Sequence, residues 1–190
     1  MTAPPALTRV EGPNLVLRLI RPDDADYVFG LRTDPAFNRH LSEVRGTVVD
    51  QRRWIEFYKA READLRELYY VIERKDGIRC GLVRLYEFGQ ETFTWGSWIL
   101  DKSKPPKAAL ESAVLSFHVG FEMLGYEKAL VEARAENENA IAFYRRLGMT
   151  ETGRADEDVY FMYLRHRFEA DRIAFMKSLE HRDTKTEMHI

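Results

Sequence analysis

Two side chains between positions 132 and 144 have the types and spacing to move protons at one site. Glu132 stands mid-strand between Val131 and Ala133, and a carboxylate in apolar company can accept a proton directly or through water. Tyr144 carries a phenol, which can act as a general acid near neutral pH when it lies beside a developing thiolate. Asn137 separates the two. This pattern predicts a general base and a general acid on neighbouring elements.

The elements that must hold these side chains follow from the local pattern. Residues 128–135 read as a buried strand, an Asn-rich turn follows, and residues 139–147 have helical spacing. Ala140, Tyr144 and Leu147 share one face of that helix. Gly148 is expected to end it, because a residue without a side chain takes the left-handed conformation most cheaply.

Each of these residues also has a purely structural interpretation. Tyr144 can be a core aromatic, and Asn137 a turn residue that tolerates the left-handed region. Glu132 can form a salt bridge to Arg134 or to another basic residue. His118 is the second candidate for the base, although a lone histidine on a long helix is usually structural or solvated.

The segment resembles the closing part of the GCN5-related N-acetyltransferases (GNAT), which use acetyl-CoA. The resemblance rests on Asn137, Ala140, Tyr144, Leu147 and Gly148, in residue type and in spacing. It implies that the asparagine lies beside the pantetheine arm and that the tyrosine hydroxyl lies near the CoA sulfur. It also implies a catalytic glutamate at position 132, where the ribosomal-protein alanine acetyltransferases of this family carry one.

The composition limits the other classes of function. The chain has 190 residues, which suits one domain, and its net charge of -2 argues against a nucleic-acid partner held by phosphate neutralisation. The start has no signal-peptide pattern and no apolar run is long enough for a membrane span, so we expect a cytoplasmic protein without a membrane partner. Cys80 is the single cysteine, and the five histidines lack metal-ligand spacing, so we expect no metal.

Hydrophobic periodicity predicts the order of the elements. Strands are expected over residues 15–21, 69–75, 78–88, 92–100, 128–135 and 158–166. Helices are expected over about 22–31, from a capping box at 47, and over 107–124, 139–147 and 167–180. Gly96 inside its strand indicates a bulge or a close approach to the backbone.

This order is that of the acetyltransferase fold, and the resemblance covers residues 13–166. It implies a mixed α/β (α+β) fold, with a mostly antiparallel central sheet, helices on both faces, and a V-shaped split between the fourth and fifth core strands. We expect residues 1–12 to be an N-terminal arm, 13–166 the acetyltransferase domain, 167–180 a C-terminal helix packed on it, and 181–190 a disordered tail.

The split is where this family binds its cosubstrate. The resemblance implies that free backbone groups of Trp98, Ile99 and Leu100 pair with the pantetheine amides. On the other side of the split, it implies cosubstrate contacts from Asn137, Asn139 and Tyr144.

The loop expected to bind the CoA pyrophosphate departs from the family pattern. The family has Arg or Gln, two residues, Gly, one residue, then Gly or Ala, where this chain reads Lys104-Pro-Pro-Lys107-Ala108-Ala109. Each proline removes a backbone donor, whereas the lysines add point charges and the first helical turn still offers N–H groups. Lys104, Lys107, Ala108 and Ala109 are therefore the predicted phosphate-side residues, with weaker CoA affinity than is usual in the family.

The acceptor is predicted to be a small-molecule amine. The run Thr47–Trp54, with Tyr69-Tyr-Val-Ile and Gly81-Leu, resembles the branch that acetylates nucleotide-linked amino sugars, and also the branch that acetylates ribosomal-protein N-termini. Five basic and aromatic side chains could bind the diphosphate and stack on the base of such an acceptor. Alternatively, they are surface charges and core aromatics. They are Arg39, Arg45, Arg84, Trp95 and Trp98. Residues 34–45 are expected to lie over the acceptor side.

Two other possibilities stay open at this point. A CoA-binding regulatory module without turnover would explain the prolines of the phosphate loop, but it would have no need of an acid at Tyr144. A homodimer is the other open possibility.

Overall fold

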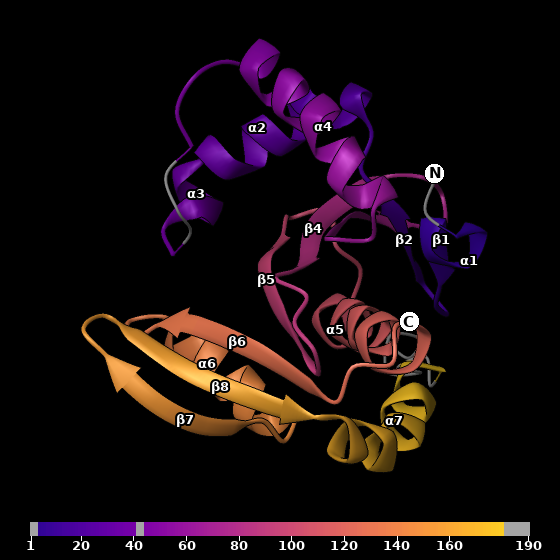
Figure 1. Cartoon of the computed structure of the whole chain (residues 1–190), viewed down its shortest axis with the longest axis vertical. Coiled ribbons are helices and arrows are strands. Elements are labelled where there is room, and N and C mark those ends of the chain that lie inside the picture. The colour runs from indigo at the N-terminus through magenta and orange to yellow at the C-terminus, as the bar shows by residue number, and fades with distance from the viewer. Residues whose placement is uncertain (1–3, 41–43, 181–190) are drawn as a thin grey trace, which may run out of the picture.

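The computed structural model describes residues 4–40 and 44–180. These ranges form one eight-stranded sheet in the order β1-β2-β3-β4-β5-β6-β8-β7, with helices on both faces (Figure 1). The expected tail over residues 181–190 lies outside the described residues. The strands are β1 Arg9–Glu11, β2 Leu15–Leu19, β3 Leu68–Arg74, β4 Arg79–Tyr86, β5 Thr92–Leu100, β6 Lys128–Arg134, β7 Thr150–Ala155 and β8 Asp158–Leu164.

The helices are α1 Pro5–Thr8, α2 Ala25–Thr33 after a 3₁₀ turn at Pro22–Asp24, α3 Pro35–Asn38, α4 Val48–Ala63, α5 Ala108–His118, α6 Glu138–Arg146 and α7 Arg165–Glu180. The longer helices, α2, α4, α5, α6 and α7, lie at the expected places in the chain. A π-helical turn, Val119–Met123, ends α5. None of the helices in the described ranges has the length and apolar character needed to cross a membrane.

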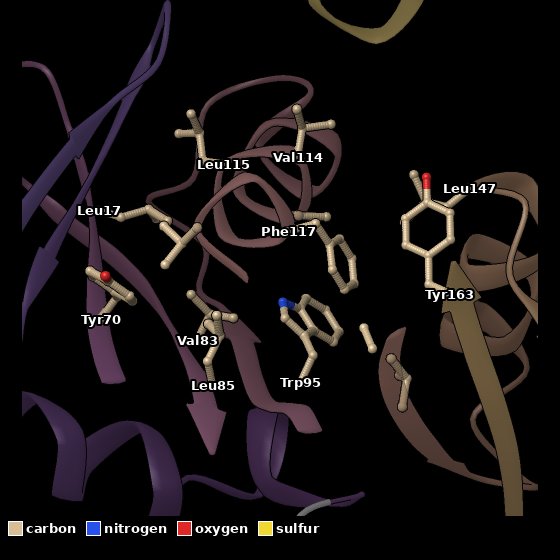
Figure 2. Close-up of a cluster of buried hydrophobic side chains, with 14 of the residues drawn as sticks. Leu17, Tyr70, Val83, Leu85, Trp95, Val114, Leu115, Phe117, Leu147 and Tyr163 are labelled. Atoms are coloured by element: carbon tan, nitrogen blue, oxygen red, sulfur yellow. The ribbon is translucent and has the colours of Figure 1, made fainter. Parts of the chain in front are cut away.

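Two apolar clusters lie on opposite faces of the sheet. On one face, α2 and α4 pack over β3, β4 and β5 through residues such as Val28, Ile55 and Tyr69. On the other, α5 and α6 cover the same sheet through a larger cluster that includes Trp95 and Phe117 (Figure 2). The predicted mixed fold with helices on both faces is therefore confirmed.

The split between the fourth and fifth core strands is also confirmed. β5 and β6 are parallel and pair only at Thr92–Lys128, Phe93–Ala129 and Thr94–Leu130. All other neighbouring strands in the sheet are antiparallel. Beyond Thr94 the two strands part, so the backbone of β5 has no strand partner on the side of β6.

A bulge lies in β5 where the split begins. Arg84 of β4 pairs with Gly96, and Leu82 pairs with Ile99, so Val83 faces two residues of β5 instead of one. The extra residue bends the strand and increases its twist. The bulge indicated by Gly96 is thus confirmed.

Four elements were not anticipated, α1, β1, α3 and β7, and all are short or exposed. β1 pairs with β2, so the predicted N-terminal arm contributes an edge strand with one buried residue, Val10. β7 is an edge strand paired with β8, and its sequence Thr-Glu-Thr-Gly-Arg-Ala shows no apolar alternation because almost none of it is buried. α3 is a single turn without a buried residue, and α1 is a single turn as well. Periodicity signals burial, so it misses strands that bury little.

A buried carboxylate ties the first two strands to α5. Glu111 has no exposed surface and accepts hydrogen bonds from the backbone N–H groups of Asn14 and Leu15, both at 2.7 Å. We expect Glu111→Ala to lower the free energy of unfolding by about 3 kcal/mol, because buried donors left unpaired cost about 1–3 kcal/mol each. Urea denaturation measures this. Glu111→Gln keeps one acceptor oxygen and should lose less; an equal loss in both variants would contradict the assignment.

Candidate active site

A cavity of about 520 Å³ opens where β5 and β6 part. Its walls come from β5, β6, the start of α5, α6 and α3. The lining residues are Phe37, His40, Gly96, Ser97, Trp98, Leu100, Lys104, Ala109, Glu132, Ala133, Arg134, Asn137, Asn139, Ala140, Ala142, Phe143, Tyr144 and Arg146.

Most of the residues singled out from the sequence meet at this cavity. It is lined by Trp98, Leu100, Lys104, Ala109, Glu132, Asn137, Asn139 and Tyr144. Ile99, Lys107 and Ala108 do not line it. The side chain of Ile99 is buried in the cluster under α2 and α4, on the opposite face of β5, so only its backbone can serve the cavity.

Tyr144 is held by aromatic neighbours with its ring almost fully enclosed. The residue is 6% exposed, and its ring meets Trp95 and Phe161 edge-on, at centroid distances of 5.9 and 5.6 Å. Burial raises the pKa of Tyr144, because it disfavours the phenolate. A protonated phenol at the wall of the cavity is a potential proton donor.

The helix that carries Tyr144 is fixed at both ends. Asn137 is its N-cap, and its Oδ1 accepts a hydrogen bond from the backbone N–H of Ala140 at 3.2 Å. At the other end, Gly148 has φ +88° and its N–H donates to the carbonyl of Arg145. The predicted glycine at the C-terminal cap is confirmed. The two caps fix the position of α6 and therefore the position of Tyr144 at the cavity.

Glu132 faces the cavity from β6, in surroundings that differ from the sequence expectation. Val131 and Ala133 are buried, but they point to the opposite face of the strand, as alternation requires. On the face of Glu132, Leu130 is 42% exposed and Tyr160 lies across on β8. Arg134 pairs with Asp158 at 3.2 Å instead of with Glu132. The carboxylate is therefore open to an incoming molecule.

A second compartment continues from the cavity toward α2. We call it the acceptor compartment; its volume is about 170 Å³. It shares His40, Gly96, Ser97, Glu132, Ala133 and Arg134 with the main cavity and adds Arg32, Tyr86 and Asp158. His40 Nδ1 lies 3.2 Å from Glu136 Oε1, which links the segment after α3 to the turn before α6 across the opening.

Phe37, Arg32 and Tyr86 were missed by the sequence reasoning. Phe37 and His40 belong to the stretch 34–45 that was expected over the acceptor side, although residues 41–43 of it lie outside the described ranges. Arg32 lies in the last turn of α2 and Tyr86 is the last residue of β4, and no sequence pattern distinguishes a site residue there from any other residue near an element's end.

In the phosphate-side loop, a lysine in the left-handed region stands where the family motif has glycine. Lys107 takes the motif's glycine position and has φ +61°, in the left-handed region, directly before α5. Its Nζ donates to the backbone carbonyl of Ser178 in α7 at 2.9 Å, away from the cavity. Lys104 and Ala109 line the cavity near the N-terminus of α5, where the helix dipole favours an anion.

The two lysines therefore should differ in their effect on CoA binding. We expect Lys104→Ala to raise the Kd for CoA by about fivefold, since an exposed charge pair contributes up to about 1 kcal/mol. Lys107→Ala, with the same loss of charge, should leave the Kd unchanged. Calorimetric titration at two salt concentrations measures both. Equal effects would contradict this assignment, and a nanomolar Kd for the unaltered protein would contradict the expected weak affinity.

The other candidates from the sequence lie elsewhere. His118 stands at the end of α5, 3.2 Å from Arg172 Nη1 and from Glu122, and does not line the cavity. Trp95 is a core residue whose Nε1 donates to Ser116 Oγ. Arg84 stacks over Tyr86 and binds Glu67.

The remaining basic and aromatic candidates divide between surface and cavity. Arg39 is exposed. Arg45 lines a pocket of about 260 Å³ together with Arg32 and Trp54. Trp98 lines the main cavity and stacks on Phe143.

A sheet parted beside a capped helix, with a phenol and a carboxylate at the opening, suits acyl transfer. A profile of the acetyltransferase (GNAT) domain matches residues 14–150, which is most of the chain, and the chain therefore belongs to the GNAT family. It is an acetyl-CoA-dependent N-acetyltransferase.

Solved structures agree with this assignment. Apo FdhC, described as a nucleotide-linked sugar GNAT, is 32% identical, with a TM-score of 0.82 over 88% of this chain and 96% of its own. A GNAT-family acetyltransferase from Bacillus anthracis is 17% identical, with a TM-score of 0.69 over 83% of this chain and 99% of its own. Spermidine/spermine N-acetyltransferase SpeG from Vibrio cholerae, in mutant form, is 19% identical, with a TM-score of 0.68 over 82% and 96%. The last two show the fold alone. A search of curated proteins finds no match.

Proposed function

We propose that this enzyme transfers the acetyl group of acetyl-CoA to the amine of a nucleotide-linked amino sugar. The observation that carries the acceptor class is the 32% identity to a nucleotide-linked sugar GNAT, which extends over 88% of this chain. The acceptor compartment and the 260 Å³ pocket that holds Arg45 and Trp54 adjoin at the side chain of Arg32, which lines both, so basic groups lie on the acceptor side.

The residues at the split fit a CoA thioester. We assign the pantetheine arm to the unpaired edge of β5 at Trp98, Ile99 and Leu100, with Asn137 and Asn139 on the opposite wall. Lys104 and Ala109, at the N-terminus of α5, suit the phosphates. Acetyl-CoA supplies the acetyl group as a thioester, whose carbonyl the backbone N–H groups of the β5 bulge are proposed to polarise.

Two side chains move the protons in this proposal. Glu132 takes the proton of the amine as its nitrogen attacks the acetyl carbon. Tyr144 gives its proton to the sulfur as the carbon–sulfur bond breaks, and both residues return to their starting states by exchange with solvent. The open carboxylate and the enclosed, protonated phenol suit these opposite roles.

Release of free thiol from acetyl-CoA tests the proposal. The full chain is incubated with acetyl-CoA and, in parallel, with UDP-amino sugars, peptides with free N-termini, and spermidine. We expect thiol release with the amino sugars. Release with peptides alone would favour a protein N-terminal acetyltransferase, and CoA binding with no release from any amine would favour a regulatory module. The cytoplasmic location and a homodimer stay predictions.

A further inference from the structure

Tyr86 is placed at the acceptor compartment by its position at the end of β4. Its ring lies under the guanidinium of Arg84, with the Arg84 Cζ 4.8 Å from the ring centroid. Arg84 is itself fixed by Glu67, its Nε donating to Glu67 Oε2 at 2.9 Å. The ring of Tyr86 is thus oriented by a charged group that is already paired.

The hydroxyl of Tyr86 lies over the β5 bulge. A Cβ added at Gly96 would meet the hydroxyl oxygen at 3.1 Å and the ring carbon Cε1 at 3.4 Å. Gly96 therefore leaves the space that this hydroxyl uses. Both residues line the acceptor compartment, and Gly96 also lines the main cavity.

Glu132 stands on the other side of the same compartment. Tyr86 and Glu132 also line a neighbouring groove of about 400 Å³ on the outer face of β6. Burial raises the pKa of Tyr86, and the negative charge of Glu132 raises it further, so the phenol stays neutral. Among the described residues, the hydroxyl of Tyr86 has no hydrogen-bond partner. A neutral phenol can both donate and accept one.

We propose that Tyr86 binds the acceptor: its hydroxyl hydrogen-bonds a ring hydroxyl beside the reacting amine and so holds that amine at Glu132. This rests on the proposed function, because an amino sugar carries hydroxyls near its amine and a simple alkylamine does not. Tyr86 takes no part in the proton transfers. It selects for acceptors with a polar group at that distance from the nitrogen.

The test separates acceptor binding from chemistry. Tyr86→Phe keeps the ring and its contact with Arg84 and removes only the hydroxyl. With a UDP-amino sugar that the enzyme acetylates, we expect the KM for the sugar to rise about tenfold, the value of one lost hydrogen bond. The kcat and the KM for acetyl-CoA should change less than twofold. With cyclohexylamine as acceptor, the variant and the unaltered enzyme should have the same kcat/KM.

Two further variants control for indirect effects. Tyr160→Phe removes a hydroxyl from the same sheet face, opposite Glu132, but outside the acceptor compartment, and should leave the KM for the sugar unchanged. Gly96→Ala crowds the Tyr86 hydroxyl without removing it and should also raise this KM. Thermal unfolding confirms that each variant is folded.

The outcomes distinguish this inference from the proposed function. If the unaltered enzyme acetylates the sugar and Tyr86→Phe keeps its KM, the inference is wrong and the function stands. If the KM for acetyl-CoA rises as much as that for the sugar, the role is structural and the inference is wrong. If no amine in the panel is acetylated, the proposed function falls, and this role of Tyr86 falls with it.

Discussion

Tyr144→Phe is expected to lower kcat by about 10²- to 10⁴-fold, the usual contribution of a positioned general acid. The phenylalanine ring fits the same space against Trp95 and Phe161, so the packing of the site is kept. What is lost is the proton for the departing sulfur. Because the KM values report binding, they should change little when binding is at equilibrium. Steady-state kinetics of thiol release measures both parameters.

The matched control for this variant is Tyr163→Phe. Tyr163 of β8 belongs to the buried cluster in Figure 2 and is 1% exposed, and its hydroxyl is without a hydrogen-bond partner in the described ranges. It does not line the cavity. Its loss should leave kcat unchanged. Full activity in Tyr144→Phe, or an equal loss in both variants, would remove the assignment of the acid.

The pH dependence offers a second test of Tyr144. Burial raises the pKa of Tyr144 above the ordinary value near 10, so the phenol is still protonated at pH 9. A raised pKa means that the proton is lost only at higher pH. We therefore expect that ionisation of Tyr144 does not lower kcat between pH 7 and 9. A decline of kcat in this range that is present in the unaltered enzyme and absent from Tyr144→Phe would contradict the assignment.

Glu132→Gln is expected to lower kcat/KM for the amine by about 10²-fold or more at pH 7, because the amide cannot accept a proton. The loss should shrink as the pH rises, since more of the free amine is then already deprotonated. A structural role would give a loss independent of pH. The rate of thiol release from pH 7 to 9, at fixed acetyl-CoA, distinguishes the two.

Glu157→Gln controls for the loss of charge near the cavity. The Glu157 side chain is 86% exposed and lies 3.6 Å from Arg134, which lines the same cavity, but Glu157 itself does not. This variant should keep the kcat/KM of the unaltered enzyme. An equal loss of kcat/KM in both variants would mean that Glu132 acts through its negative charge and not by accepting a proton.

The sequence predicted the parts of the fold whose residues are buried or conformationally constrained. Gly148 needed the left-handed region, and Gly96 marked a strand that departs from regular pairing; both are found where expected. The exposed strands β1 and β7 were missed, since an edge strand that buries little carries no alternating pattern.

The site was predicted less fully, because the sequence does not show in which direction each side chain points. Sequence neighbours suggested that Glu132 is enclosed, yet in a strand the adjacent side chains point to the other face. Similarly, Lys107 occupies the expected motif position, but its side chain extends to α7. The orientation of a side chain, and the partner it meets far along the chain, depend on tertiary packing that spacing does not encode.

The short contact between β5 and β6 also bears on how the chain assembles. β3, β4 and β5 pair with sequence neighbours, as do β7 and β8, whereas the pairs at residues 92–94 with 128–130 must wait until α5 has crossed between them. Contacts near in sequence form at lower loop-closure cost than distant ones. The β3–β5 meander and the β7–β8 hairpin therefore have reason to form before β5 pairs with β6 and before β2 pairs with β3. The pairing that bounds the proposed substrate site is then added only after both of those units exist.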